Sequence, residues 1–85
     1  MTSEEAREWL ARCTIAKHLG VTVAEVVDGA RFREDLKADS LDIAGLANEL
    51  EQAFDIQIDD DEAEGCTTVA AAVALIERKV AHGAR

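Results

Sequence analysis

The chain has 85 residues and a formal net charge of −9, which limits it to one domain with a modest core and excludes a two-domain enzyme. Hydrophobic residues make up 48% of the chain, but aromatic residues make up only 4% and proline is absent. This composition favours helices over a small sheet, which would need many turns. We therefore expect an all-α fold in a single domain over residues 1–85, with residues from about 82 to 85 frayed.

The acidic residues are concentrated in the middle of the chain. Residues 34–64 contain twelve acidic residues and one basic residue, Lys37, whereas the remainder contains six acidic and eight basic residues. The middle segment therefore carries a charge of −11 and the remainder +2. An acidic field repels nucleic acid and anionic lipid and attracts basic protein surfaces. No apolar run approaches the roughly eighteen residues needed to span a membrane. We expect basic protein partners, without nucleic acid binding or stable membrane insertion.

The first predicted helix begins after Thr2, which forms a capping-box pattern with Glu5, and ends at residue 18 or 19, before Gly20. Its apolar residues form a broad arc that Arg12 interrupts, so the pattern does not define the packing face. Residues 21–39 keep neither the helical nor the strand period. They are predicted to form a long loop with one helical turn, and such a long connection is uncommon.

Three more helices are predicted after this loop, and the middle one of the three is short. Asp39 is the N-cap of the first of them, with Asp42 at its third helical position. The chain is thus expected to be a small four-helix bundle with three longer helices, a short third helix and a long first loop. The predicted spans are 40–54, about 60–64, and a last helix from Thr67 or Thr68 to about residue 81.

The sequence patterns of common catalytic and metal sites are absent. There is no GxSxG motif around Ser40, no HExxH motif and no glycine-rich phosphate loop, so we expect no enzyme. Cys13 and Cys66 lie far apart and lack the spacing of metal ligands. The acidic run 59–62 lacks the pattern of a calcium loop and is interpreted as a solvated face. We expect reduced thiols, no metal site and a cytoplasmic protein.

A serine, Ser40, occupies the first turn of the second predicted helix. Its hydroxyl lies beside free backbone N–H groups and the positive end of the helix dipole, where a phosphate ester is well tolerated. From residues 39–42 alone, a plain capping role for Asp39 and Ser40 is the stronger interpretation.

The residues around Ser40 change that interpretation, because together they resemble acyl carrier proteins of the free-standing type used in fatty acid and polyketide synthesis. The resemblance runs without a gap from about Leu19 to Ile76. The residues that carry it are Phe-Arg-Glu-Asp-Leu-Lys-Ala-Asp-Ser-Leu-Asp at 32–42, Leu46, Leu50-Glu51, Phe-Asp-Ile at 54–56, Ile58 and Thr-Thr-Val at 67–69.

The resemblance implies that Ser40 carries 4′-phosphopantetheine, transferred from coenzyme A by a separate, magnesium-dependent phosphopantetheinyl transferase. The chain itself would catalyse nothing, and the thiol of the arm would hold acyl groups as thioesters. Implied partners of this expected monomer are acyl-ACP synthetases or ligases, ketosynthases, acyltransferases and similar enzymes with basic surfaces. The expected docking residues are Asp39, Leu41, Asp42, Glu49 and Glu51.

Several positions depart from the family pattern. Lys37 stands where the family usually has glycine, Gly45 where it has a docking glutamate, and Asn48 where methionine is frequent. Asp59 replaces a common proline, and Cys66 replaces a larger aliphatic residue. We expect these changes to mark a specialised carrier rather than the housekeeping one. Gly45 is expected to leave room for an unusual acyl group or for a closely approaching partner.

The sequence leaves the cargo open among fatty acid, polyketide, lipid A and aminoacyl pathways. One alternative is an aminoacyl or peptidyl carrier that an adenylating ligase loads. The other is an acidic helical adaptor without a prosthetic group. Modification of Ser40 separates the adaptor from both carriers, because only a carrier needs the attached arm.

Overall fold

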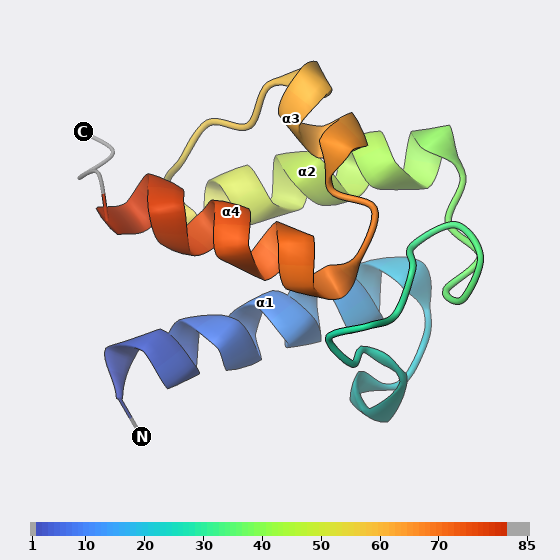
Figure 1. Cartoon of the computed structure of the whole chain (residues 1–85), viewed down its shortest axis with the longest axis horizontal. Coiled ribbons are helices and arrows are strands. Elements are labelled where there is room, and N and C mark those ends of the chain that lie inside the picture. Colours follow the sequence, from blue (N-terminus) through green and yellow to red (C-terminus); the bar gives the residue numbers. More distant parts are fainter. Residues whose placement is uncertain (1, 82–85) are drawn as a thin grey trace.

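The computed structural model describes residues 2–81, and within this range the chain forms four α-helices and one turn of 3-10 helix (Figure 1). The all-α four-helix prediction is confirmed, including the short third helix and the long first loop. The expected frayed tail, residues 82–85, lies outside the described residues. The elements are α1 (Ser3–Leu19), η1 (Val23–Glu25), α2 (Ser40–Phe54), α3 (Asp60–Gly65) and α4 (Val69–Ala81).

The helices begin and end at the capping residues that the sequence indicates. At α1, the Glu5 N–H donates to the Thr2 hydroxyl at 3.1 Å, and the Thr2 N–H donates to the Glu5 carboxylate at 2.8 Å. At α2, the Asp42 N–H donates to Asp39 at 2.8 Å, and the Asp39 N–H donates to Asp42 at 3.2 Å. Gly20 ends α1 with a φ of 71°, a left-handed conformation that favours glycine.

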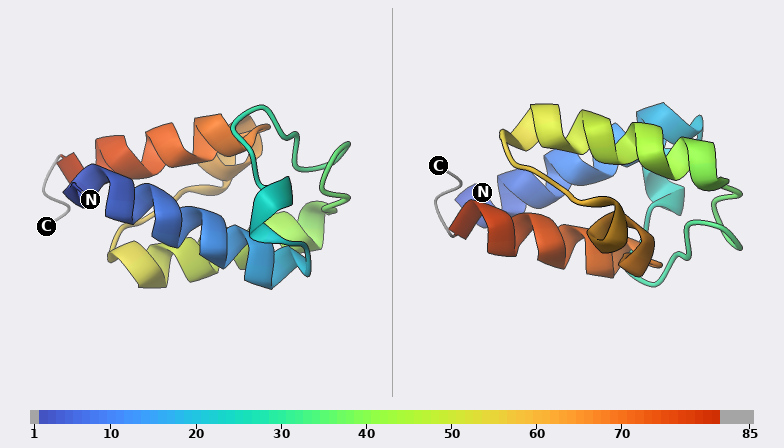
Figure 2. Two further views of the ribbon diagram at one scale, coloured as in Figure 1. Left: turned by 90° about the horizontal axis from the view of Figure 1, so that it is seen from below. Right: turned by 90° about the horizontal axis from the view of Figure 1, so that it is seen from above.

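Three long helices enclose the core, and α3 lies over the seam between α2 and α4 on the side opposite α1 (Figure 2). Of the two threonine candidates, Thr68 caps α4, because its hydroxyl accepts from the Ala71 N–H at 3.2 Å. No helix in residues 2–81 is long and apolar enough to cross a membrane. The largest fully buried side chains, which mark the centre of the core, are Ile15, Val26, Val69 and Ile76.

The packing face of α1 is narrower than its apolar arc. Trp9 belongs to the arc, yet 54% of it is exposed. Arg12, which interrupts the arc, holds the long loop: its guanidinium donates to the Val26 carbonyl at 2.8 Å and pairs with Asp28. The buried residues of α1 are Ala11, Ile15 and Ala16.

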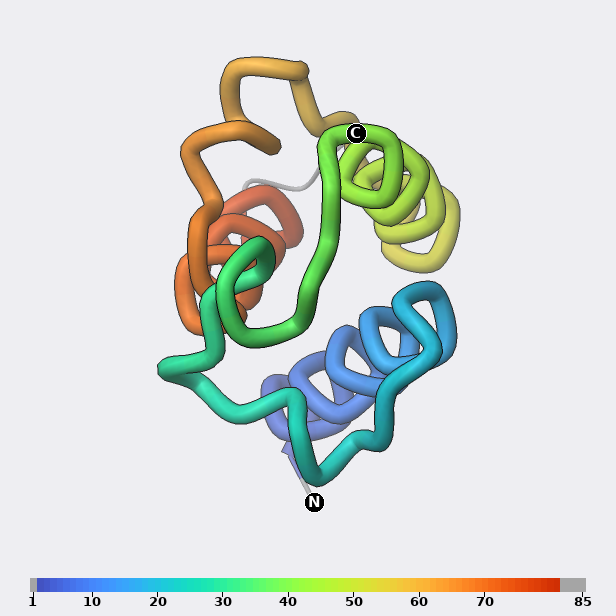
Figure 3. The backbone as a smooth tube through the Cα atoms, turned by 90° about the vertical axis from the view of Figure 1, so that its right-hand side faces the viewer, coloured from blue at the N-terminus to red at the C-terminus, as the bar shows by residue number. Residues whose placement is uncertain are grey.

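The long loop runs along the ends of the helices and leads into the first turn of α2 (Figure 3). The Phe32 N–H donates to the Thr67 carbonyl at 3.0 Å, and the Val69 N–H donates to the Ala30 carbonyl at 3.0 Å. These bonds fix the middle of the loop against the start of α4. The loop is also anchored in the core, and its buried residues are Val26, Ala30, Phe32, Leu36 and Ala38.

The short helix α3 is tied to its neighbours by two polar contacts. The Lys79 ammonium of α4 pairs with the Glu62 carboxylate at 2.8 Å, and this bond lowers the pKa of Glu62. The Ile58 N–H, just before α3, donates to the Glu51 carboxylate of α2 at 2.7 Å. No residue of α3 is buried, so its attachment depends largely on such edge contacts.

Candidate functional site

Ser40 is the first residue of α2 and is exposed to solvent. The Asp42 N–H is taken by the Asp39 side chain and the Ile43 N–H by the Asp39 carbonyl. Within residues 2–81, the N–H groups of Ser40 and Leu41 have no hydrogen-bond partner. The hydroxyl of Ser40 therefore lies next to two free donors at the positive end of the α2 dipole, a setting that suits a phosphate ester.

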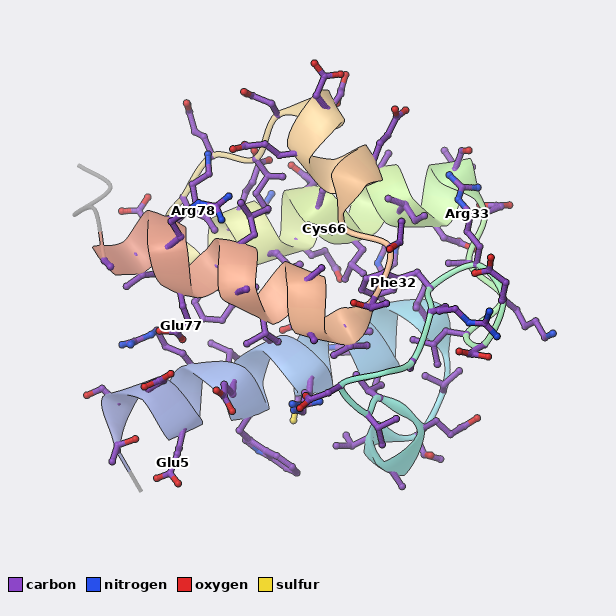
Figure 4. The ribbon with its side chains drawn as sticks, viewed as in Figure 1. Glu5, Phe32, Arg33, Cys66, Glu77 and Arg78 are labelled. Carbon is purple, nitrogen blue, oxygen red and sulfur yellow. The ribbon has the colours of Figure 1, made fainter. Side chains whose placement is uncertain are left out.

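A cation from the long loop lies against this hydroxyl. The Arg33 guanidinium Nη2 donates to the Ser40 Oγ at 3.2 Å, and Figure 4 shows Arg33 beside the first turn of α2. The two residues are seven apart in sequence, and the loop brings them together. Sequence reasoning did not assign Arg33 to the site, because no periodic pattern predicts contacts across an irregular loop.

An open groove starts at Ser40 and follows the seam between α2 and α3; we call it the α2–α3 groove. Both of its walls mix small apolar side chains with acidic ones. Because Ser40 lies at one end of the groove, a chain attached to this serine has a track along the surface. The groove is lined by Arg33, Ser40, Ile43, Ala44, Ala47, Asn48, Glu51, Ile58, Asp60, Ala63 and Glu64.

Beneath the groove lies an apolar cavity between α2, α3 and α4, which we call the inner cavity. Its volume is about 30 Å³, enough for roughly one or two water molecules. Four of its lining residues, Ile43, Ala47, Ile58 and Ala63, also line the α2–α3 groove and so separate the two spaces. The other lining residues are Phe32, Leu46, Leu50, Cys66, Ala72, Leu75 and Ile76.

Cys66 contributes a thiol to the wall of the inner cavity, near Phe32 (Figure 4). Its S–H donates to the Ala71 carbonyl at 3.8 Å, and burial raises the pKa of the Cys66 thiol. The thiol therefore stays protonated at neutral pH, where it behaves as a small apolar group. Cys13 and Cys66 are both free and partly buried.

A second hollow, which we call the loop hollow, lies on the other side of Arg33 from the α2–α3 groove. It is bounded by the loop and by the segment that precedes α4. Arg33, Ile43 and Glu64 line both spaces and so lie between them. The remaining residues of the loop hollow are Arg31, Phe32, Glu34, Cys66, Thr67 and Thr68.

The first turn of α2 contains three of the five expected docking residues. Leu41 is 80% exposed, the largest exposure among the big apolar side chains of residues 2–81. Asp39 and Asp42 each accept one bond from the other's backbone in the capping box. Their carboxylates therefore have a structural role in addition to any contact with a partner.

The other two expected docking residues, Glu49 and Glu51, form bonds within the fold. Glu49 accepts from, or pairs with, the His18 Nδ1 of α1 at 3.0 Å, and Glu51 accepts from the Ile58 N–H at 2.7 Å. The Glu49 side chain is 49% exposed, so it still faces solvent. These two glutamates lie on opposite flanks of the exposed face of α2, one toward α1 and the other toward α3.

Lys37 adopts a left-handed backbone conformation, with a φ of 61°. A residue with a Cβ is disfavoured there by about 1–2 kcal/mol, and glycine is not. This conformation explains why glycine fits the position. In this chain a basic side chain occupies it at a conformational cost.

Gly45 faces α1, where its missing side chain makes space for a histidine ring. A Cβ at Gly45 would lie 2.9 Å from the His18 Cε1 and 3.0 Å from the His18 Nε2. The expectation that Gly45 leaves room for an acyl group or a partner is therefore wrong. The His18 imidazole fills that space, because α1 and α2 approach each other closely there.

The acidic residues near α3 do not form a metal site. Within residues 2–81, no group of three or more His, Cys, Asp or Glu side chains is arranged to hold a metal ion. The Asp59 N–H donates to the Glu62 carboxylate at 3.0 Å, so part of this acidic segment caps α3.

Comparison with known proteins gives the family of this chain. Residues 10–76 match the family model described as the phosphopantetheine attachment site. A curated acyl carrier protein from Rubrobacter xylanophilus is 51% identical over 73 residues, which cover 86% of this chain and 89% of that protein. A solved structure of acyl carrier protein from Enterococcus faecalis has a TM-score of 0.76 and 31% identity, covering 92% of this chain and 99% of that one. The chain therefore belongs to the acyl carrier proteins, which are non-catalytic carriers with a covalently attached 4′-phosphopantetheine.

Proposed function

We propose that Ser40 is the residue that carries the 4′-phosphopantetheine arm. The observation that carries this proposal is the exposed hydroxyl at the start of α2, beside two free N–H donors and 3.2 Å from the Arg33 guanidinium. Ser3 is the other serine of the chain and occupies the first position of α1. Helical position alone therefore does not select the residue, whereas the arginine contact and the α2–α3 groove favour Ser40.

The chain contributes the Ser40 hydroxyl, the α2–α3 groove and the apolar inner cavity, and it adds no catalytic step of its own. When attached, the group supplies a terminal thiol that holds a cargo as a thioester. The residues of this chain orient the attachment point at the mouth of the α2–α3 groove. In this proposal the first part of the arm lies close to the four residues that separate the groove from the inner cavity.

We propose an acyl cargo, because the inner cavity has apolar walls. At about 30 Å³ the cavity is too small for more than the tip of a chain, so an acyl group enters only if the helices separate. The element that moves in this proposal is α3, which has no buried residue and is held by the Glu62–Lys79 pair. An aminoacyl or peptidyl cargo has less support, because the cavity offers few polar partners.

We propose that partner enzymes dock on the exposed face of α2. Residues three and four apart on a helix share a face, and the exposed Leu41, Ala44, Asn48 and Gln52 follow this spacing. Acidic side chains flank this neutral strip: Asp39 and Asp42 at its start, with Glu49 and Glu51 along its sides. A phosphopantetheinyl transferase and biosynthetic enzymes with basic rims suit such a surface.

We propose a specialised carrier rather than a housekeeping carrier, and we propose that it acts in the cytoplasm. Asn48 lies in the neutral strip, where the family pattern favours methionine, whereas Gly45 lies against the His18 ring of α1 and not in the strip. Because the strip is neutral, partner binding on this surface depends on Leu41 and on the acidic residues around it. Partner binding should weaken with salt, because exposed charges are screened.

Intact-mass spectrometry tests the attachment site. The wild type, Ser40→Ala and Ser3→Ala are each incubated with coenzyme A, magnesium and a broad-specificity transferase. The wild type and Ser3→Ala should each gain one phosphopantetheine mass, and Ser40→Ala should gain none. A mass gain in Ser40→Ala would contradict the assignment. No gain in the wild type would favour the acidic adaptor.

A further inference from the structure

We propose that Arg33 is a positioning residue that binds the phosphate of the arm and directs the arm into the α2–α3 groove. This inference rests on the proposed attachment at Ser40. It concerns a residue of the long loop, outside the helix that carries the serine, and it gives that residue a specific ligand.

The geometry already places the guanidinium where a phosphate would be. Arg33 Nη2 lies 3.2 Å from the Ser40 Oγ, the atom that becomes the bridging oxygen of the ester. The phosphorus is bonded directly to that oxygen, so its free oxygens lie within reach of the same guanidinium. Within residues 2–81, the bond to Ser40 is the one hydrogen bond of Arg33, which leaves its other N–H groups available for a two-point contact with phosphate.

The surrounding charges favour a cation at this point. The phosphate adds a negative charge beside Asp39 and Asp42, in the most acidic part of the chain. Two other basic residues of the loop are nearby in sequence. Arg31 is already paired with Asp35 at 3.1 Å, and Lys37 makes no hydrogen bond or ion pair within the described range. Arg33 is the one of these three that contacts Ser40.

The position of Arg33 also determines which way the arm extends from the phosphate. Arg33 lies between the α2–α3 groove and the loop hollow, because it lines both spaces. Both spaces share lining residues with the inner cavity, the groove four and the loop hollow three (Phe32, Ile43 and Cys66), but only the groove includes Ser40. A guanidinium bound to the phosphate occupies the boundary between the two spaces. The rest of the arm is then directed along α2 and α3, toward the inner cavity.

Phosphorus NMR of the loaded protein tests this role directly. The samples are wild type, Arg33→Gln, Arg33→Lys and the matched control Arg31→Gln, each first shown by mass to carry one arm. The phosphorus resonance is recorded from about 0.01 M to about 1 M salt, a range over which exposed ion pairs go from weakly to strongly screened. All three substitutions lie at exposed positions, so the fold should be retained.

The wild type and Arg31→Gln should show a phosphorus resonance that moves as salt is added. The phosphorus resonance of Arg33→Gln should lose most of this movement. Its chemical shift at low salt should match that of the wild type at high salt. Arg33→Lys should restore part of the movement, because it restores the charge without the two-point contact. A wild-type salt response in loaded Arg33→Gln would overturn the role of Arg33 while leaving attachment at Ser40 intact. A wild type that gains no mass would overturn the attachment, and the inference with it.

Discussion

Gly45 and His18 test how closely α1 and α2 pack, because a single methyl group at position 45 changes the contact between them. Replacing a helix-interior glycine with alanine normally stabilises a protein by about 1 kcal/mol. Here the new Cβ would lie 2.9 Å from the His18 Cε1, and overpacking of this kind costs about 1–3 kcal/mol. Gly45→Ala should therefore leave the free energy of unfolding unchanged or lower it by up to about 2 kcal/mol.

The sign of this effect should reverse when the imidazole is removed. In a His18→Ala background the clash is absent, so Gly45→Ala should raise the free energy of unfolding by about 1 kcal/mol, or the melting temperature by about 4–8 °C. In the wild-type background, movement of the ring away from position 45 is opposed by its contact with Glu49 at 3.0 Å.

A double-mutant cycle, measured by urea unfolding, isolates the coupling between the two positions. The cycle comprises the wild type, Gly45→Ala, His18→Ala and the double variant. The coupling should be about 1–3 kcal/mol, since it equals the cost of the clash. An equal effect of Gly45→Ala in both backgrounds would refute the close approach of His18 to Gly45.

Three further predictions concern stability and docking. Lys37→Gly should raise the free energy of unfolding by about 1 kcal/mol, because it relieves the left-handed strain at a φ of 61°; a lower melting temperature would contradict this. Asp39→Ala should lower the free energy of unfolding by about 1 kcal/mol, because it removes the cap of α2. Asp39→Asn should keep the cap and weaken only the salt-sensitive binding to a partner, which calorimetry measures. Stability should fall on acidification, because the bond to Lys79 lowers the pKa of Glu62. The ion pair stabilises the fold at pH values above the carboxyl's unfolded pKa of about 4.3. This stabilisation is lost as the pH falls through the lower pKa of the folded state. Glu62→Gln should make the decline of the urea midpoint between about pH 6 and pH 3 shallower, and an unchanged decline would count against the pair.

Local signals were sufficient to predict the helices. Capping residues such as Thr2 and Asp39 fix where α1 and α2 begin, and Gly20 fixes where α1 ends, because each acts through neighbours in sequence. The packing face of α1 was not predictable in the same way. Trp9 looks like a core residue in its apolar arc but is exposed, and Arg12 in the same arc binds the loop. Such choices depend on which partner covers the helix.

The candidate site also contains residues that local sequence predicts and contacts that it does not predict. Ser40 follows from its motif and from its position at the first turn of a helix. The Arg33 contact and the His18 ring at Gly45 join segments whose approach depends on the packed fold, so no local pattern predicts them. The docking set was predicted as a group of five residues. The structure distinguishes them, because Leu41 is 80% exposed while Glu51 accepts a hydrogen bond from the Ile58 backbone.

The most direct test of the central claim is to locate the arm on the chain. Loaded wild-type protein is digested, and its peptides are fragmented in a tandem mass spectrometer. The added mass should fall on Ser40 alone, within the peptide that contains the start of α2, and Ser3 should be unmodified. An arm on Ser3, or on any other residue, would contradict the account.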